Sequence, residues 1–276
     1  MLTRAFRKAL LAATLLTFVT QPVTIARQAA EQKPSFAPSD PLQFDTAVMR
    51  GTLPNGLAYY IRRNTRPEHR VMLQLAVKAG SVDETDQQQG LAHFLEHMAF
   101  NGSAHFEPGE LIKALESTGA RMGPHVNAYT SFDETVYMFQ VPTDTPGVVD
   151  KALQGLADVG GNLTLDPKEI DRERGVVIEE WRGGLGAAAR LRDQQIPVLY
   201  HGSKYAERLP IGEPDVLKTF TPATLRAFYT KWYRPDRMAL VVVGDIDPAA
   251  MEATVKTMFG GMERPGSSMS TGSRRR

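Results

Sequence analysis

Two histidines stand four residues apart in the segment Gly90–Phe100, with a glutamate one position before the second of them. The segment has helical spacing, so His93 and His97 lie about 40° apart on one face of the expected helix. Two imidazoles in this arrangement can bind one divalent cation, and Glu96 projects beside that cation without being a ligand. The segment therefore predicts a metal site with a carboxylate next to it.

A catalytic zinc site takes three protein ligands and keeps a position for water. The helical stretch Glu169–Arg182 offers acids, and its Glu173 and Glu180 are seven residues apart, within about 20° of one face. Glu179 is turned about 100° away from Glu180 and is expected on a solvated face. One of the aligned pair can bind the metal while the other orients a ligating imidazole. The spacing alone leaves both assignments open.

The chain has no cysteine, which excludes disulfides, thiolate metal sites and thiol nucleophiles. Any metal site must therefore use imidazoles and carboxylates. His105 and His125 are rival ligands, but the first follows Asn-Gly-Ser out of the expected helix and the second precedes an expected strand. We expect local hydrogen bonding for both.

The balance of basic and acidic side chains argues against a nucleic-acid-binding function. Residues 1–30 carry four basic and no acidic side chains, so the remainder has 28 basic against 31 acidic side chains. Nucleic-acid-binding domains normally carry a basic surplus, because phosphate neutralisation supplies much of their affinity. No nucleic-acid partner is expected.

Both ends of the chain are predicted to lie outside the folded domain. Residues 1–30 resemble a signal peptide, with a basic start, an apolar run over Ala9–Thr20 and a small-residue exit. The apolar run is shorter than the ~20 residues that span a bilayer, so we expect an exported protein, periplasmic or secreted, with no stable membrane anchor. Residues 31–46 read as a proline-containing linker, and residues 261–276 as a flexible tail.

The elements that must position the candidate residues lie in residues 47–260, which we expect to form one domain. A hairpin is predicted around Pro54-Asn55-Gly56, since Asn-Gly supplies the positive φ of a tight turn. Further strands are predicted at 71–78, 126–130, 135–141 and 238–243, and helices at 88–100, 108–117, 147–159, 167–199, 222–232 and from 248. Adjacent strands with grouped helices indicate an α+β fold.

Several blocks together resemble the zinc peptidases related to pitrilysin, insulin-degrading enzyme and the mitochondrial processing peptidase. The blocks are LPNGLAYYIRRN, GLAHFLEHMAFNGS, NAYTSFDETVY, ERGVVIEEW and YRPDRMALVVVGDID, in the family's order. The resemblance implies a two-layer domain, a mostly antiparallel sheet packed against helices, that forms one half of a clamshell. It also implies an endopeptidase that hydrolyses peptides or small unfolded polypeptides.

The resemblance assigns roles by position. His93, His97 and Glu180 match the ligands of one Zn²⁺ per chain, Glu96 matches the general base, and Glu173 matches the carboxylate that supports a ligand. The strand with Asn127, Ala128 and Tyr129 looks like the edge that pairs with a peptide substrate.

The family also implies a partner, either a homologous second domain or a second copy of the chain. Some domains of the family hold no metal and only enclose substrate, so a noncatalytic partner half is the alternative reading. Intact residues at all four positions argue against it.

Overall fold

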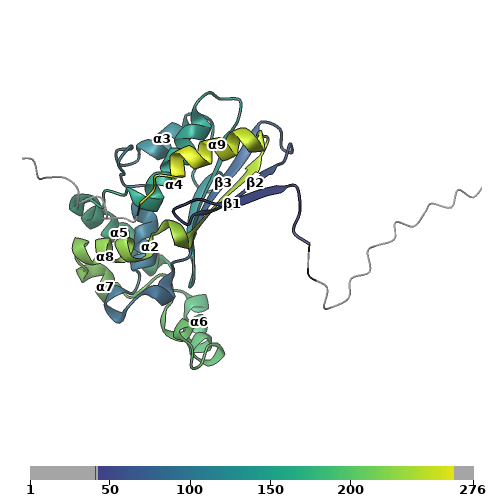
Figure 1. Cartoon of the computed structure of the whole chain (residues 1–276). Coiled ribbons are helices and arrows are strands. Elements are labelled where there is room, and N and C mark those ends of the chain that lie inside the picture. Colours follow the sequence, from purple (N-terminus) through teal and green to yellow (C-terminus); the bar gives the residue numbers. More distant parts are fainter. Residues whose placement is uncertain (1–40, 42, 264–276) are drawn as a thin grey trace, which may run out of the picture. The chain divides into compact units, whose positions relative to one another are not determined.

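The computed structural model describes residue 41 and residues 43–263 (Figure 1). The expected signal peptide, most of the expected linker and most of the expected tail lie outside the described residues. Phe44 and the described residues after it form one compact unit, whose first strand starts at Val48.

The described residues form one six-stranded sheet. The strands are β1 (Val48–Thr52), β2 (Ala58–Arg63), β3 (Arg70–Val77), β4 (Val126–Thr130), β5 (Thr135–Pro142) and β6 (Met238–Gly244). Their order is β1-β2-β6-β3-β5-β4, and every neighbouring pair is antiparallel except β2 and β6. The mostly antiparallel sheet is as expected. The sequence did not predict that β6 would lie between β2 and β3.

The predicted hairpin is confirmed as β1 and β2. Its turn is closed by backbone bonds from Leu53 N to Leu57 O (2.8 Å) and from Gly56 N to Leu53 O (2.9 Å). Gly56 has a φ of 96°, which residues with a Cβ rarely adopt. The side chain of Asn55 also donates to the carbonyl of Phe259 (2.8 Å), so the turn is anchored to the end of the last helix.

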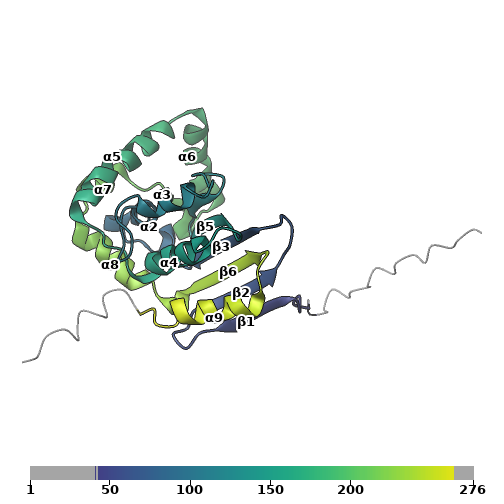
Figure 2. The ribbon, with the colours of Figure 1, turned by 90° about the horizontal axis from the view of Figure 1, so that it is seen from above.

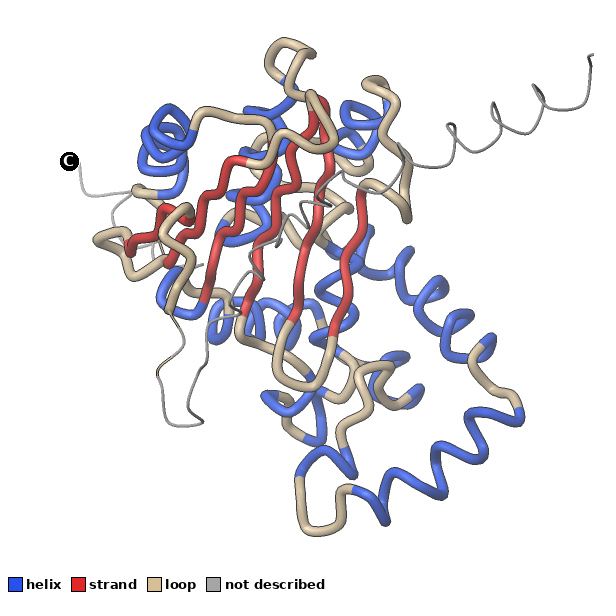
Figure 3. The backbone as a smooth tube through the Cα atoms, turned by 90° about the vertical axis from the view of Figure 1, so that its right-hand side faces the viewer, coloured by secondary structure: helices blue, strands red, loops and turns tan. Residues whose placement is uncertain are grey.

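The described residues also form eight α-helices. They are α2 (Leu91–Met98), α3 (Glu110–Glu116), α4 (Val148–Gly161), α5 (Pro167–Gly183), α6 (Ala187–Leu199), α7 (Pro214–Thr219), α8 (Pro222–Trp232) and α9 (Pro248–Phe259). Helices α2, α4 and α9 pack against one face of the sheet. Figure 2 shows α9 alongside β1 and β2, and Figure 3 shows the strands in front of most helices.

The burial of alternate strand residues explains this arrangement. In β3, Val71, Leu73, Leu75 and Val77 are fully buried while the residues between them are partly exposed. Successive side chains of a strand point to opposite faces, so one face packs against the helices and the other stays accessible. The α+β, two-layer expectation is confirmed.

One predicted helix is two helices. The stretch 167–199 divides into α5 and α6, and three of the four residues Gly183–Gly186 are glycine. Glycine is a poor helix former because ordering its backbone costs more entropy than ordering that of other residues. The apolar spacing continues through this break, which is why the pattern alone suggested one helix. The short helix α7 also had no predicted counterpart.

Candidate metal centre

Helix α2 carries three of the candidate residues and is almost entirely buried. It starts after Gly90, whose φ of 100° is left-handed. The carboxylate of Glu84 accepts hydrogen bonds from the backbone N–H groups of Gly90 (3.0 Å) and Ala92 (2.8 Å), so it caps the helix. Glu84 is 1% exposed, and burial raises its pKa to about 8 against the lowering effect of these two bonds.

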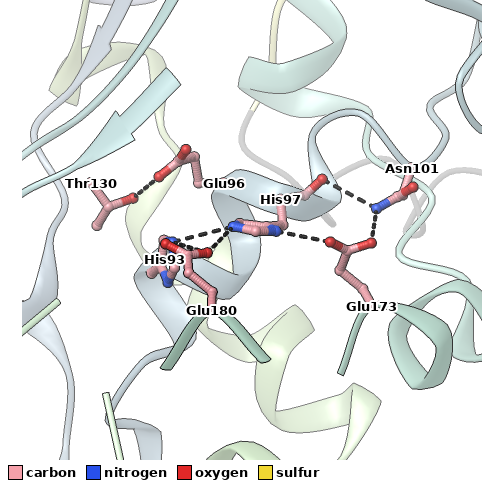
Figure 4. Close-up of polar contacts among 7 residues, drawn as sticks. All are labelled: His93, Glu96, His97, Asn101, Thr130, Glu173 and Glu180. Carbon is pink, nitrogen blue, oxygen red and sulfur yellow. Dashed lines mark hydrogen bonds and ion pairs between the residues drawn. The ribbon is translucent and has the colours of Figure 1, made fainter. Parts of the chain in front are cut away.

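Helix α5 brings a carboxylate to the two histidines of α2. Glu180 Oε2 lies 3.6 Å from His93 Nε2 and 3.3 Å from His97 Nε2, and the two Nε2 atoms are 3.2 Å apart (Figure 4). Nitrogen and oxygen ligands at about 2.0–2.1 Å from a tetrahedral Zn²⁺ are themselves roughly 3.3–3.4 Å apart. The three donor atoms therefore fit one zinc ion. No other group of three His, Asp or Glu in the described part of the chain is arranged in this way.

Glu173 contacts the opposite nitrogen of His97. Its Oε1 lies 2.8 Å from Nδ1, and its Oε2 accepts from the side-chain amide of Asn101 at 2.9 Å. A carboxylate can only accept here, so Nδ1 carries a proton, which leaves Nε2 as the nitrogen that could bind a metal. The hydrogen bond from His97 lowers the pKa of Glu173 more than burial raises it. Burial lowers the pKa of His97, but Glu173 and the other nearby carboxylates raise it more.

His93 is held neutral by its surroundings. Burial, followed by the charge of His97, lowers its pKa to about 4. Its ring is nearly perpendicular to that of His97, at 86°. A neutral imidazole can offer a nitrogen lone pair to a metal, whereas a protonated one cannot.

Glu96 lies beside the three donors and is not one of them. Its Oε2 accepts a hydrogen bond from Thr130 Oγ1 at 2.7 Å. Burial raises the pKa of Glu96, and the Thr130 bond opposes that rise. A carboxylate with a raised pKa next to a metal position is suited to take up and release a proton.

A cavity of about 340 Å³ opens over these groups. It is lined by the three donors and Glu96, by Ala128, Tyr129 and Thr130 of β4, and by Pro210 and Ile211. Of the three residues expected to bind substrate, Ala128 and Tyr129 line the cavity and Asn127 does not. Asn127 instead accepts the backbone N–H of Ala128 with its side-chain oxygen, at 3.0 Å.

Strand β4 is the last strand of the sheet and lies next to this cavity, and its outer edge carries a short bridge from Val126 to Met122. His125 and Ser131 flank β4, and their backbones face β5. Gln140 N donates to His125 O, and Ser131 N donates to Glu134 O. Residues of an antiparallel strand face the partner alternately, so the backbone of Ala128 faces away from β5. Its N–H therefore points to the outer edge of the sheet, where the side-chain oxygen of Asn127 accepts it.

The rival histidines lie elsewhere. His105 Nδ1 is 2.8 Å from the buried carboxylate of Asp158, and His125 Nδ1 accepts from the backbone N–H of Arg121.

Some residues of the site were not predicted. Asn101 stands four residues after His97, and this helical spacing could have indicated it. Glu84, Pro210 and Ile211 have no local signal in the sequence.

Two family models match the chain. Residues 59–192 match the one described as Insulinase (Peptidase family M16), and residues 219–273 match the Peptidase M16 inactive domain. The second stretch includes β6, which pairs with β2 and β3 of the first, so both matches fall on one sheet. The chain belongs to the insulinase family of peptidases.

The chain is also similar to individual proteins and solved structures. The probable zinc protease PqqL of Haemophilus influenzae is 40% identical over 216 residues, which are 78% of this chain and 23% of that protein. The crystal structure of the periplasmic protease PqqL from Escherichia coli matches with a TM-score of 0.78 and 37% identity over 85% of this chain and 25% of that one. A structure of the first half of the same protease matches equally well, and this chain covers 49% of it. The chain thus spans about a quarter of its full-length relatives.

Within the described residues, none of the helices is long and apolar enough to cross a membrane.

Proposed function

We propose that this chain is the zinc-binding domain of an endopeptidase that cleaves peptides or small unfolded polypeptides. The observation that carries the proposal is the spacing of His93 Nε2, His97 Nε2 and Glu180 Oε2, at 3.2–3.6 Å from one another beside Glu96. Intact donors and an intact candidate base favour this function over a noncatalytic partner half. One zinc ion per chain is proposed on the same ground.

Zinc held by these three residues would polarise the scissile carbonyl and lower the pKa of a coordinated water towards ~7. Glu96 would accept the proton of the attacking water and deliver it to the leaving amine. Thr130 donates to one oxygen of Glu96, so the other oxygen would take up the proton. Glu173 fixes the ring of His97 with Nε2 directed at the metal position.

The substrate would add to the outer edge of β4 as an extended strand. Backbone pairing provides most of the affinity in this mode, and side chains contribute specificity. The N–H of Ala128 would exchange the oxygen of Asn127 for a substrate carbonyl. Export to the periplasm or beyond is proposed from the signal-like residues 1–30 and from the location of the E. coli relative.

The test is zinc content measured beside cleavage of a fluorogenic peptide panel. We expect about one equivalent of zinc in the wild-type chain and loss of it in His93→Ala and His97→Ala, because too few ligands remain. Glu96→Gln should keep its zinc and lose at least ~100-fold in cleavage rate. Full zinc occupancy in both histidine variants would overturn the metal assignment, and full activity of Glu96→Gln would remove Glu96 as the base.

A further inference from the structure

The side-chain amide of Asn101 joins the end of α2 to α5 (Figure 4). Its Nδ2 donates to the carbonyl oxygen of His97 (3.3 Å) and to Oε2 of Glu173 (2.9 Å). An amide nitrogen carries two hydrogens, so it can make both bonds at once. The contact therefore ties Glu173 to the helix that carries both candidate histidine ligands.

With this bond, each oxygen of Glu173 has a donor of its own. Oε1 lies 2.8 Å from His97 Nδ1, and Oε2 accepts from Asn101. The terminal torsion of a glutamate side chain has only broad preferences, so a single hydrogen bond leaves the carboxylate plane able to turn. Two donors, one on each oxygen, fix that plane. The direction of His97 Nε2 depends on it, because Oε1 holds the opposite nitrogen of the same ring.

The loop that follows Asn101 is itself fixed to the core. Asp158 of α4 is 1% exposed, and its Oδ2 accepts from Ser103 Oγ (2.6 Å) and from the backbone N–H of His105 (3.1 Å). Its Oδ1 lies 2.8 Å from His105 Nδ1. A buried carboxylate needs such partners, and here they all come from one short loop and its own helix. Asn101 stands between this anchored loop and α2, so its side chain is held at Glu173.

We propose that Asn101 is a positioning residue of the metal centre, which fixes the carboxylate of Glu173 and, through it, the ring of His97 with Nε2 directed at the metal position. The inference rests on the proposed zinc site. Asn101 is not one of the three donors and does not line the cavity over them, so its effect must pass through Glu173. Groups that orient a ligand in this indirect way change metal affinity by about 10–100-fold when they are substituted.

The first test is a double-mutant cycle on zinc affinity. Asn101→Ala should raise the zinc dissociation constant by about 10-fold, the lower end of that range, because Glu173 itself is retained. In a Glu173→Ala background the same substitution should change the constant by less than ~2-fold, since the group through which Asn101 acts is already absent. Equal losses in both backgrounds would mean that Asn101 only stabilises the end of α2, and would overturn the proposal.

Asn64→Ala is the matched control for this cycle. Asn64 is exposed just after β2, and its side-chain oxygen accepts from the backbone N–H of Arg66 at 3.2 Å. The substitution therefore removes one side-chain amide and one bond to the backbone, as Asn101→Ala does, but away from the metal centre. Its zinc affinity should equal that of the wild-type chain.

A measurement on the metal-free chain separates this inference from the proposed function. The Nδ1 proton of His97 should give a downfield imidazole N–H signal in the NMR spectrum, identified by its loss in His97→Ala. Asn101→Ala should shift or broaden this signal, and Asn64→Ala should not. An unchanged signal in Asn101→Ala would overturn the proposal whether or not the chain binds zinc. A wild-type chain that shows the Asn101-dependent signal but binds no zinc would support the alignment of His97 and contradict the proposed metal centre.

The contact can also be tested with Asn101 in place. In the wild-type chain its side-chain amide donates to a carboxylate, so the NMR signals of that amide should shift in Glu173→Ala. A shift would support the proposal even if Asn101→Ala did not fold. Signals that stay in place would exclude the contact and overturn the proposal.

Discussion

At the residue scale, His97 has two different carboxylate neighbours. Glu173 contacts Nδ1 and Glu180 faces Nε2, so the first fixes the ring and the second could bind the same metal ion as Nε2. Supporting carboxylates of this kind contribute to metal affinity indirectly, because they orient a ligand and raise its basicity.

This difference predicts an order of zinc affinities. Glu173→Gln should weaken zinc binding by about 10–100-fold, the usual effect of losing a ligand's supporting carboxylate. Glu180→Gln should weaken it more, because a direct ligand is lost. Competition with a chromogenic chelator measures both dissociation constants, with Glu179→Gln as the control on the exposed side of α5. If Glu173→Gln proves the weaker zinc binder of the two, the roles of Glu173 and Glu180 are exchanged.

At the element scale, α2 depends on a residue outside the predicted metal motif. Glu84 caps its first turn from a fully buried position, and burial raises the pKa of Glu84 from 4.5 to about 8. The folded state therefore favours the protonated carboxyl. Its contribution to stability is complete below about pH 4.5 and is lost as the pH rises towards 8.

We accordingly expect the free energy of unfolding of the metal-free chain to fall by a few kcal/mol between about pH 5 and about pH 8, since one pKa unit corresponds to about 1.4 kcal/mol. Glu84→Gln keeps an acceptor for the helix and cannot ionise, so its stability should depend less on pH. Urea unfolding at a series of pH values measures this, with the exposed Glu116→Gln as the control. Parallel pH profiles for wild type and Glu84→Gln would mean that Glu84 does not titrate in this range.

Strand β4 is the second element whose backbone matters. Ala128→Pro removes an N–H that faces away from β5 and takes no part in the ladder, so the fold should tolerate it. Cleavage of extended peptides should fall by at least ~10-fold with zinc content unchanged, because a bond to the substrate is lost and φ is fixed. Asn127→Ala, which frees the same N–H, should not reduce kcat/KM. Normal cleavage by a folded Ala128→Pro chain would exclude pairing at this position.

At the scale of the whole molecule, the proposed centre is open to solvent. The side chain of Glu180 is 50% exposed, and the chain spans about a quarter of its full-length relatives. Orientation of the substrate and exclusion of water can supply several kcal/mol of a reaction barrier. A homologous second domain that covers the cavity would provide both.

We therefore predict that the isolated chain binds zinc but cleaves peptides slowly, and that its specific activity rises with a homologous partner domain or with self-association. The measurement is specific activity across a dilution series, with and without candidate partner domains, beside size-exclusion chromatography. High and constant specific activity of a strictly monomeric chain would show that a second half is not needed.

The sequence alone determined the parts of the site that depend on short-range geometry. His93, Glu96 and His97 stand on one helix with 3.6 residues per turn, so their relative positions follow from their spacing. The β1–β2 hairpin followed from Asn55-Gly56 for the same reason, since a short turn with glycine in the left-handed region fixes its own backbone conformation. The motif blocks were sufficient to indicate the family and with it the two-layer fold.

Only the tertiary structure decided what depends on how separate elements cross. Glu173 and Glu180 share a face of α5, but seven residues place them roughly 10 Å apart along its axis, and the crossing with α2 sets one beside Nδ1 of His97 and the other beside both Nε2 atoms. The Thr130 bond to Glu96 and the place of β6 between β2 and β3 likewise join residues that are far apart in sequence. Such contacts depend on packing over the whole core, which no local pattern encodes.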